Sequence, residues 1–146
     1  MSSKLYNILV PVDFTGKNKW AIAKAIELSN SFHCNVHLVY VRSKRYSFFE
    51  RNASIENSLK KLEQFRDTYS QQICGEGALE ISVLTGNKQK QLADYIQQYE
   101  MDLVVTGLSK FNFIHRIASS VSISRLAKKT NIPVLAVRPG GIGLSF

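Results

Sequence analysis

The sequence has few of the residues that staple or interrupt a small fold. Its 146 residues include two cysteines, three prolines and eight glycines. The cysteines, Cys34 and Cys74, fit neither a close metal-ligand pair nor a redox pair, so we expect two thiols in a reducing compartment. The composition is that of an ordinary globular chain. A chain of this length buries a sizeable core without staples, and we expect one domain over residues 1–146.

Long hydrophobic runs are also missing. Apolar stretches such as residues 8–12 and 36–41 are far shorter than the roughly 20 residues that cross a bilayer. No apolar signal core follows Lys4. We therefore expect a cytoplasmic protein that makes no contact with a membrane.

Acidic residues are scarce relative to basic ones. Eleven Asp and Glu residues stand against nineteen Lys and Arg residues, which gives a formal net charge of +8 and a pI near 9.6. This excess of positive charge favours anionic partners. The basic residues belong to no known nucleic-acid reading motif, so we do not expect DNA or RNA as a partner.

Apolar segments of strand length alternate with segments of helical period along the whole chain. We expect strands over residues 7–12, 36–41, 79–85, 102–107 and 134–137. We expect helices over residues 21–32, from Ser54 to about Ile73, over residues 92–99, and from Ser119 or Ser120 to Thr130. The alternation predicts an α/β sheet with helices on both faces. Ligands of such sheets bind beyond the carboxyl ends of the strands where the strand order reverses, here after the first and fourth strands.

Four segments taken together resemble the universal stress protein family. They are Ile8-Leu9-Val10-Pro11-Val12-Asp13-Phe14-Thr15, Gly107, Ser119-Ser120-Val121 and Ile132-Pro133-Val134-Leu135-Ala136-Val137-Arg138. The resemblance implies a Rossmann-like, adenine nucleotide alpha hydrolase-like fold, with a five-stranded parallel sheet in the order 3-2-1-4-5. It also implies a homodimer formed through the last strand and, in one branch of the family, an adenine nucleotide at the switch point.

Asp13 directly follows the first strand and has two interpretations. The resemblance gives its carboxylate to the ribose or adenine of a nucleotide, with Pro11 and Val41 as apolar contacts. Alternatively, an aspartate after a strand bonds nearby backbone groups and shapes the turn. The sequence leaves both interpretations open.

The segment after the fourth strand departs from the phosphate loop of the nucleotide-binding branch. That loop resembles Gly-x-x-Gly, nine residues, then Gly-Ser or Gly-Thr, and its glycines let backbone amides approach phosphate. Here Gly107 is followed by Lys110 at the second glycine position, and the last pair is Ser119-Ser120, one residue early if Ser120-Val121 is matched to the family's Ser-Val. A non-glycine residue in such a conformation costs on the order of 1 kcal/mol.

Bulky side chains fill the same segment. Phe111, Phe113 and Ile114 lie between the two motif positions. We expect them to occupy space that a nucleotide would use. Together with the missing glycines, they predict weak or absent binding of ATP.

Positive charge nevertheless gathers in the connections at this edge of the sheet. Lys17, Arg42, His115 and Arg116 are the expected anion rim, and Ser119 and Ser120 open a helix whose amino end attracts anions. A small phosphate or a nucleotide could bind there by charge. Alternatively, the basic residues are a solvated face and the serines cap the helix.

The sequence offers no catalytic arrangement. It has no Gly-x-Ser-x-Gly motif, and no acidic residue accompanies His115 in its loop. Asp13-Phe14-Thr15-Gly16 replaces the serine- and glycine-rich loop that the related adenylating enzymes need after their first strand. His37 lies within a strand, where we expect a packed or hydrogen-bonded side chain. We expect no enzyme, no metal and no required cofactor, with ATP or AMP as the only ligands to consider.

The last expected strand has an apolar edge. Val134, Leu135, Ala136 and Val137 would expose unpaired backbone groups there, which proteins normally cover. Pairing with a second copy of the strand would cover them and form a homodimer. Alternatively, the tail at residues 140–146 folds back over the edge, or it is a linker to a further domain.

Two functions follow from these patterns. The first is a dimeric, non-catalytic stress-response module that binds ATP weakly or not at all and works through a protein partner. The alternative is a stress protein that binds ATP or AMP between the first and fourth strands. Its expected binding residues are Pro11, Asp13, Val41, Gly107, Lys110, Ser119, Ser120 and Val121.

Overall fold

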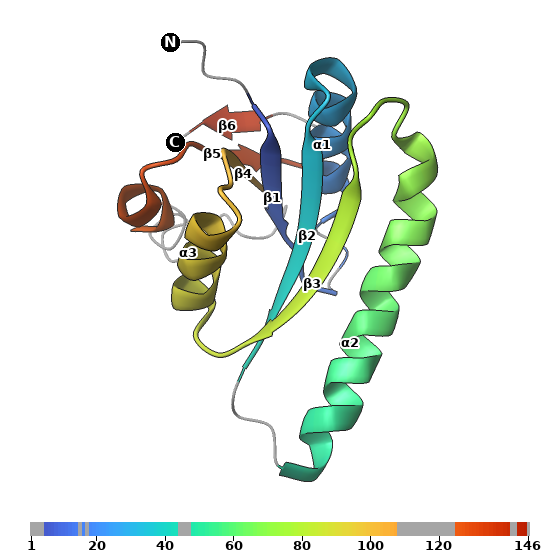
Figure 1. Ribbon diagram of the computed structural model, residues 1–146, viewed down its shortest axis with the longest axis vertical. Coiled ribbons are helices and arrows are strands. Elements are labelled where there is room, and N and C mark those ends of the chain that lie inside the picture. The colour runs from blue at the N-terminus through green and yellow to red at the C-terminus, as the bar shows by residue number, and fades with distance from the viewer. Residues whose placement is uncertain are drawn as a thin grey trace.

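A six-stranded sheet forms the centre of the described part of the chain. The computed structural model describes residues 5–14, 16, 18–43, 48–107, 125–140 and 143–145. The strand order is β3-β2-β1-β4-β5-β6 (Figure 1). The strands are β1 Asn7–Pro11, β2 Asn35–Arg42, β3 Leu79–Thr85, β4 Leu103–Gly107, β5 Val134–Val137 and β6 Gly143–Ser145. The first five pair in parallel, which confirms the order 3-2-1-4-5 expected from the sequence.

Helices cover both faces of this sheet. They are α1 Lys19–Phe32, α2 Phe48–Tyr69, the short 3₁₀ helix η1 Ser70–Gln72 and α3 Lys88–Gln98, and residues 125–130 are also helical. Figure 1 shows α3 and residues 125–130 on one side of the sheet and α1 and α2 on the other. None of the helices in the described ranges is long and apolar enough to cross a membrane.

The continuous apolar run of β1 is explained by burial on both faces. Ile8 and Val10 pack in the core on the α1 and α2 side, whereas Leu9 packs in the core on the α3 side. Successive side chains of a strand point to opposite faces, so a central strand needs an apolar residue at every position. The sheet is therefore held between two separate hydrophobic cores.

Helix α2 begins earlier than the sequence suggested. It starts at Phe48, six residues before the expected cap Ser54, and ends at Tyr69, where η1 replaces the expected last turn. No proline or glycine lies between these two starting points, so nothing stops the helix from extending towards its amino end. Ile55 and Leu59 continue the apolar repeat but are exposed, because this end of α2 extends past the sheet (Figure 1).

The chain covers the outer edge of β5 itself. β6 pairs antiparallel with β5, in the register Leu135↔Ser145, Ala136↔Leu144 and Val137↔Gly143. One edge of β5 therefore bonds to β4 and the other to β6. The prediction that Val134–Val137 pairs directly with a second copy is wrong, because β6 already occupies the outer edge of β5. The fold-back of the tail is the alternative that the structure supports.

Candidate functional site

The carboxyl ends of β1, β2 and β4 meet at the point where the strand order reverses. β1 lies between β2 and β4, and the register pairs Pro11 with Val39 and Leu9 with Val104. The Val12 backbone N–H still donates to the Val39 oxygen at 2.9 Å, Asp13 follows directly, and Gly107 is the last residue of β4. The structure thus brings Pro11, Val41 and Gly107 to the same edge as Asp13, where ligands of open α/β sheets bind.

Asp13 is held by Asn18, the residue that precedes α1. The Asn18 side-chain amide donates to the backbone oxygen of Asp13 and lies 3.2 Å from its carboxylate Oδ1. Asn18 is buried, with 5% of its surface exposed, and its side chain does not cap the helix. The Asn18 amide therefore ties the end of β1 to the start of α1. This contact supports the turn-shaping interpretation of Asp13.

An aromatic cluster that the sequence reasoning missed fixes the same turn. The ring of Phe14 lies 4.6 Å from that of Tyr40 and 6.0 Å from that of Phe65. The Lys61 ammonium lies 4.8 Å from the centre of the Phe14 ring, at cation–π distance. An aromatic residue two positions after the expected strand at residues 7–12 was the signal that could have identified this anchor. The cluster joins the β1–α1 turn to α2.

Arg42 is not on the anion rim. Only 1% of its surface is exposed, and its guanidinium Nη1 lies 3.3 Å from Thr85 Oγ1. The expectation failed because β2 runs one residue further than its apolar stretch and pairs with β3 to the end, so Arg42 lies opposite Thr85 inside the sheet. The rim prediction treated a strand residue as a loop residue.

The other expected site residues lie outside the described ranges. They are Lys17, Lys110, His115, Arg116, Ser119, Ser120 and Val121. Their parts in a nucleotide site or an anion rim stay predictions. In the described residues no three His, Cys, Asp or Glu side chains cluster in a way that could hold a metal ion.

A polar cluster is buried under α3, away from this edge. His37 Nδ1 lies 2.7 Å from the Tyr95 hydroxyl, which is also 3.4 Å from Ser82 Oγ. Burial lowers the pKa of His37, while the nearby Glu80 carboxylate acts in the opposite direction. Burial raises the pKa of Tyr95. The contacts confirm that His37 is a packed, hydrogen-bonded side chain.

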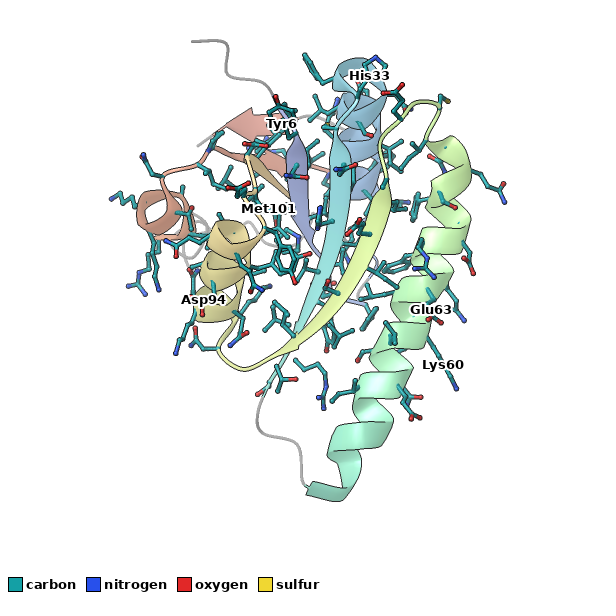
Figure 2. The ribbon with its side chains drawn as sticks, in the orientation of Figure 1. Tyr6, His33, Lys60, Glu63, Asp94 and Met101 are labelled. Carbon is teal, nitrogen blue, oxygen red and sulfur yellow. The ribbon has the colours of Figure 1, made fainter. Side chains whose placement is uncertain are left out.

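A hollow at the opposite edge has a structural explanation. It measures about 560 Å³ and lies where Tyr6 and Met101 are labelled in Figure 2. The Asp102 carboxylate in its wall accepts hydrogen bonds from the backbone N–H groups of Tyr6 and Asn7, each at 2.9 Å. These bonds fasten the amino end of β1, so we do not assign a ligand there.

Known structures share the fold over nearly the whole chain. A universal stress protein of Lactobacillus plantarum is 22% identical with a TM-score of 0.76, covering 94% of this chain and 100% of its own. One from Burkholderia pseudomallei is 20% identical with a TM-score of 0.69, covering 94% and 98%. One from Archaeoglobus fulgidus, solved in complex with dAMP, is 17% identical with a TM-score of 0.66, covering 91% and 98%. No curated protein matches significantly.

The family assignment rests on sequence as well as on fold. The model of the universal stress protein family matches residues 5–138, which span every described element except β6. The matched range includes the β1 end, the β4 end and the β5 strand that carried the resemblance. The chain belongs to the universal stress protein family.

Proposed function

We propose that this chain is a non-catalytic stress-response module that binds ATP weakly or not at all. The contact between Asn18 and Asp13 carries this proposal, because it engages the carboxylate that the family resemblance assigns to a nucleotide. A ribose hydroxyl would have to share this carboxylate with the Asn18 amide. The Asn18 amide holds the β1–α1 turn through the Asp13 backbone oxygen and one of the two carboxylate oxygens.

The sequence beyond Gly107 supports the same proposal. Lys110 and Ser119 stand where the nucleotide-binding pattern has glycines. Glycine lets successive backbone N–H groups turn towards phosphate without steric cost, and other residues resist that conformation. The triphosphate thus loses the backbone cradle that would hold most of its charge.

Nucleotide titration of the purified chain tests the proposal. We expect ATP and AMP at 1 mM to leave the thermal unfolding midpoint unchanged, and calorimetry to detect no binding in the micromolar range. A ligand present at 100 times its dissociation constant would add about 2.7 kcal/mol to the free energy of unfolding. Submicromolar binding of ATP would overturn the proposal.

Binding of an adenine nucleotide is the second candidate function. The position of Asp13, Val41 and Gly107 at the reversal of strand order favours it, as does the dAMP complex of the Archaeoglobus fulgidus relative. Under this alternative, replacing Asp13 by Ala abolishes nucleotide binding. Nucleotide binding by the wild type that is lost in D13A would support the alternative. An unchanged affinity of D13A for the nucleotide would reject this site.

The remaining parts of the proposal concern the setting in which the module works. We propose that the chain acts in the cytoplasm, as one domain, through contact with a protein partner and without a required cofactor. We also propose a homodimer. Since β6 covers β5, the outer backbone edge at this end of the sheet is that of β6, and we propose that it meets a second copy. Light scattering of the full chain measures the mass, and a monomer at every concentration would contradict the dimer.

A further inference from the structure

A basic groove lies beside α3 and shares no residue with the site at the carboxyl ends of β1 and β4. It has a volume of about 600 Å³ and is lined by Asn87, Gln89, Arg125, Lys128 and Lys129. Two walls form it. One is the amino end of α3 with the residue before it, and the other is the helical segment at residues 125–130.

The hydrophobic core sets the orientation of the basic wall. Leu126 is buried in the same core as Leu92 and Ile96 of α3, and Ala127 packs against that core. Residues three and four apart share one face of a helix, so Arg125, Lys128 and Lys129 form a single basic face while Leu126 holds the segment down. Because this helix packs against the core, the position of its basic face on the surface is fixed.

The charge of the groove is not neutralised within the described part of the chain. Arg125, Lys128 and Lys129 are exposed, and none forms an ion pair with another described residue. Lys88 and Lys90 add two exposed positive charges from the first turn of α3. The exposed acidic residue of that helix, Asp94, lies further along it (Figure 2). Several like charges at one surface attract anions to it.

The opposite wall offers hydrogen-bonding groups of a peptide-like kind. The Asn87 side-chain oxygen accepts a hydrogen bond from the Lys90 backbone N–H at 3.0 Å and so caps α3. That bond uses the oxygen, and the Asn87 side-chain N–H groups can then donate to a ligand carbonyl. Gln89 also lines the groove.

The lining distinguishes between kinds of anionic partner. None of its described lining residues is aromatic, whereas single-stranded nucleic acids are held largely by stacking of bases on aromatic rings. It is concave, whereas double-stranded DNA is read by an element that projects into its groove. An acidic peptide fits both walls. Its carboxylates face the Lys and Arg side chains of one wall, and its backbone faces the carboxamides of the other.

We propose that this groove docks an acidic segment, rich in Asp and Glu, of a partner protein. The inference rests on the proposed action through a protein partner and names the chemistry of that partner. Carboxylates of the segment pair with Arg125, Lys128 and Lys129, and its backbone lies along Asn87 and Gln89. The five groove residues are not among the candidate nucleotide-binding residues, and the proposed docking does not require ATP.

Peptide binding to the full chain tests this proposal. The probe is a fluorescein-labelled peptide of twelve residues in which Glu and Asp alternate with Ser, and the control peptide carries Gln and Asn instead. We expect fluorescence anisotropy to report binding of the acidic peptide only, weakening as salt rises from 50 to 300 mM. We expect the variant K128E/K129E to weaken binding at least tenfold.

Lys60 provides a matched control, because it is exposed on α2, on the other side of the molecule (Figure 2). K60E and K129E change the net charge equally, and melting curves verify that both fold. We expect K60E to stay within twofold of wild type. Equal weakening by K60E and K129E, no binding of the acidic peptide, or tighter binding of an oligonucleotide that K128E/K129E abolishes would each overturn the proposal. Tight ATP binding would overturn the proposed weak nucleotide binding and leave the peptide result standing.

Discussion

At the scale of single residues, His37 couples the stability of the core to pH. It is 7% exposed, and burial lowers its pKa below the ordinary value of 6.5. The unfolded chain therefore takes up a proton at a pH where the folded chain does not, so stability is full above about pH 6.5 and falls as the pH drops below it. Each unit of difference between the two pKa values corresponds to about 1.4 kcal/mol.

Urea unfolding at pH 7.5 and pH 5 checks the His37 prediction. We expect H37N to lose less stability than wild type over this interval, since its amide does not titrate. Glu80, opposite His37 on β3, favours the protonated ring, so E80Q should increase the loss. An equal loss in H37N and wild type would contradict the assignment.

Gly77 is required by close packing. A Cβ atom there would lie closer than van der Waals contact to the Cys34 backbone oxygen and to Ser29 Oγ, which themselves share a hydrogen bond of 2.6 Å. Overpacking of this kind costs typically 1–3 kcal/mol, so we expect G77A to lower the free energy of unfolding by that amount. Gly75 is the control, because among the described residues its new Cβ would meet the movable His33 side chain and no backbone atom. Equal effects of G75A and G77A in urea unfolding would contradict this.

At the scale of elements, β6 protects the edge of β5. Without β6, the outer backbone groups of Val134–Val137 would face solvent, and an apolar open edge recruits other strands. We expect a chain ending at Pro139 to associate into larger species than the full chain does and to lose amide protection in β5. Light scattering and hydrogen exchange measure the two effects.

A point variant separates the edge from the tail. L144P removes one backbone donor from β6 and leaves the chain length unchanged, and we expect it to reproduce part of the effect. A truncated chain with the mass and the β5 protection of the full chain would show that β6 contributes nothing to the edge.

The sequence predicted the elements that bury an apolar pattern. β1 and β5 are apolar at nearly every position, and α3 repeats its apolar residues every three to four positions, so their types follow from burial alone. β6 could not be predicted, because Gly143-Leu144-Ser145 has no pattern of its own and forms a strand only against β5. The early start of α2 was missed because the cap rule favoured Ser54 although no helix breaker precedes it.

The candidate site was predictable only in part, for a related reason. Pro11, Asp13 and Gly107 were found because they end apolar strands. The Asn18 contact and the Phe14 cluster depend on neighbours distant in sequence or on a side-chain direction that spacing does not give. Arg42 was misplaced because a charged residue at a strand end reads as exposed, while sheet pairing buries it.

At the scale of the whole molecule, nucleotide binding and the free energy of unfolding are thermodynamically linked. A ligand that binds only the folded chain raises the free energy of unfolding by an amount set by its concentration and affinity. If the missing glycines are what weakens ATP binding, restoring them should make the whole chain more stable in the presence of ATP.

The variant K110G/S119G makes this restoration in the segment after Gly107. We expect ATP at 100 times its dissociation constant to stabilise the variant by about 2.7 kcal/mol, a rise in melting temperature of roughly 5–10 °C, while wild type stays unchanged. K110A/S119A removes the same side chains without the freedom of glycine, and should not respond to ATP.

A response of K110A/S119A equal to that of K110G/S119G would assign the barrier to the bulk and charge of the side chains. No response in either variant would leave the Asp13–Asn18 contact as the obstacle, and D13A could not then restore binding because it removes the carboxylate itself. N18A, which removes the Asn18 carboxamide and keeps the Asp13 carboxylate, is the variant that should then make ATP binding measurable.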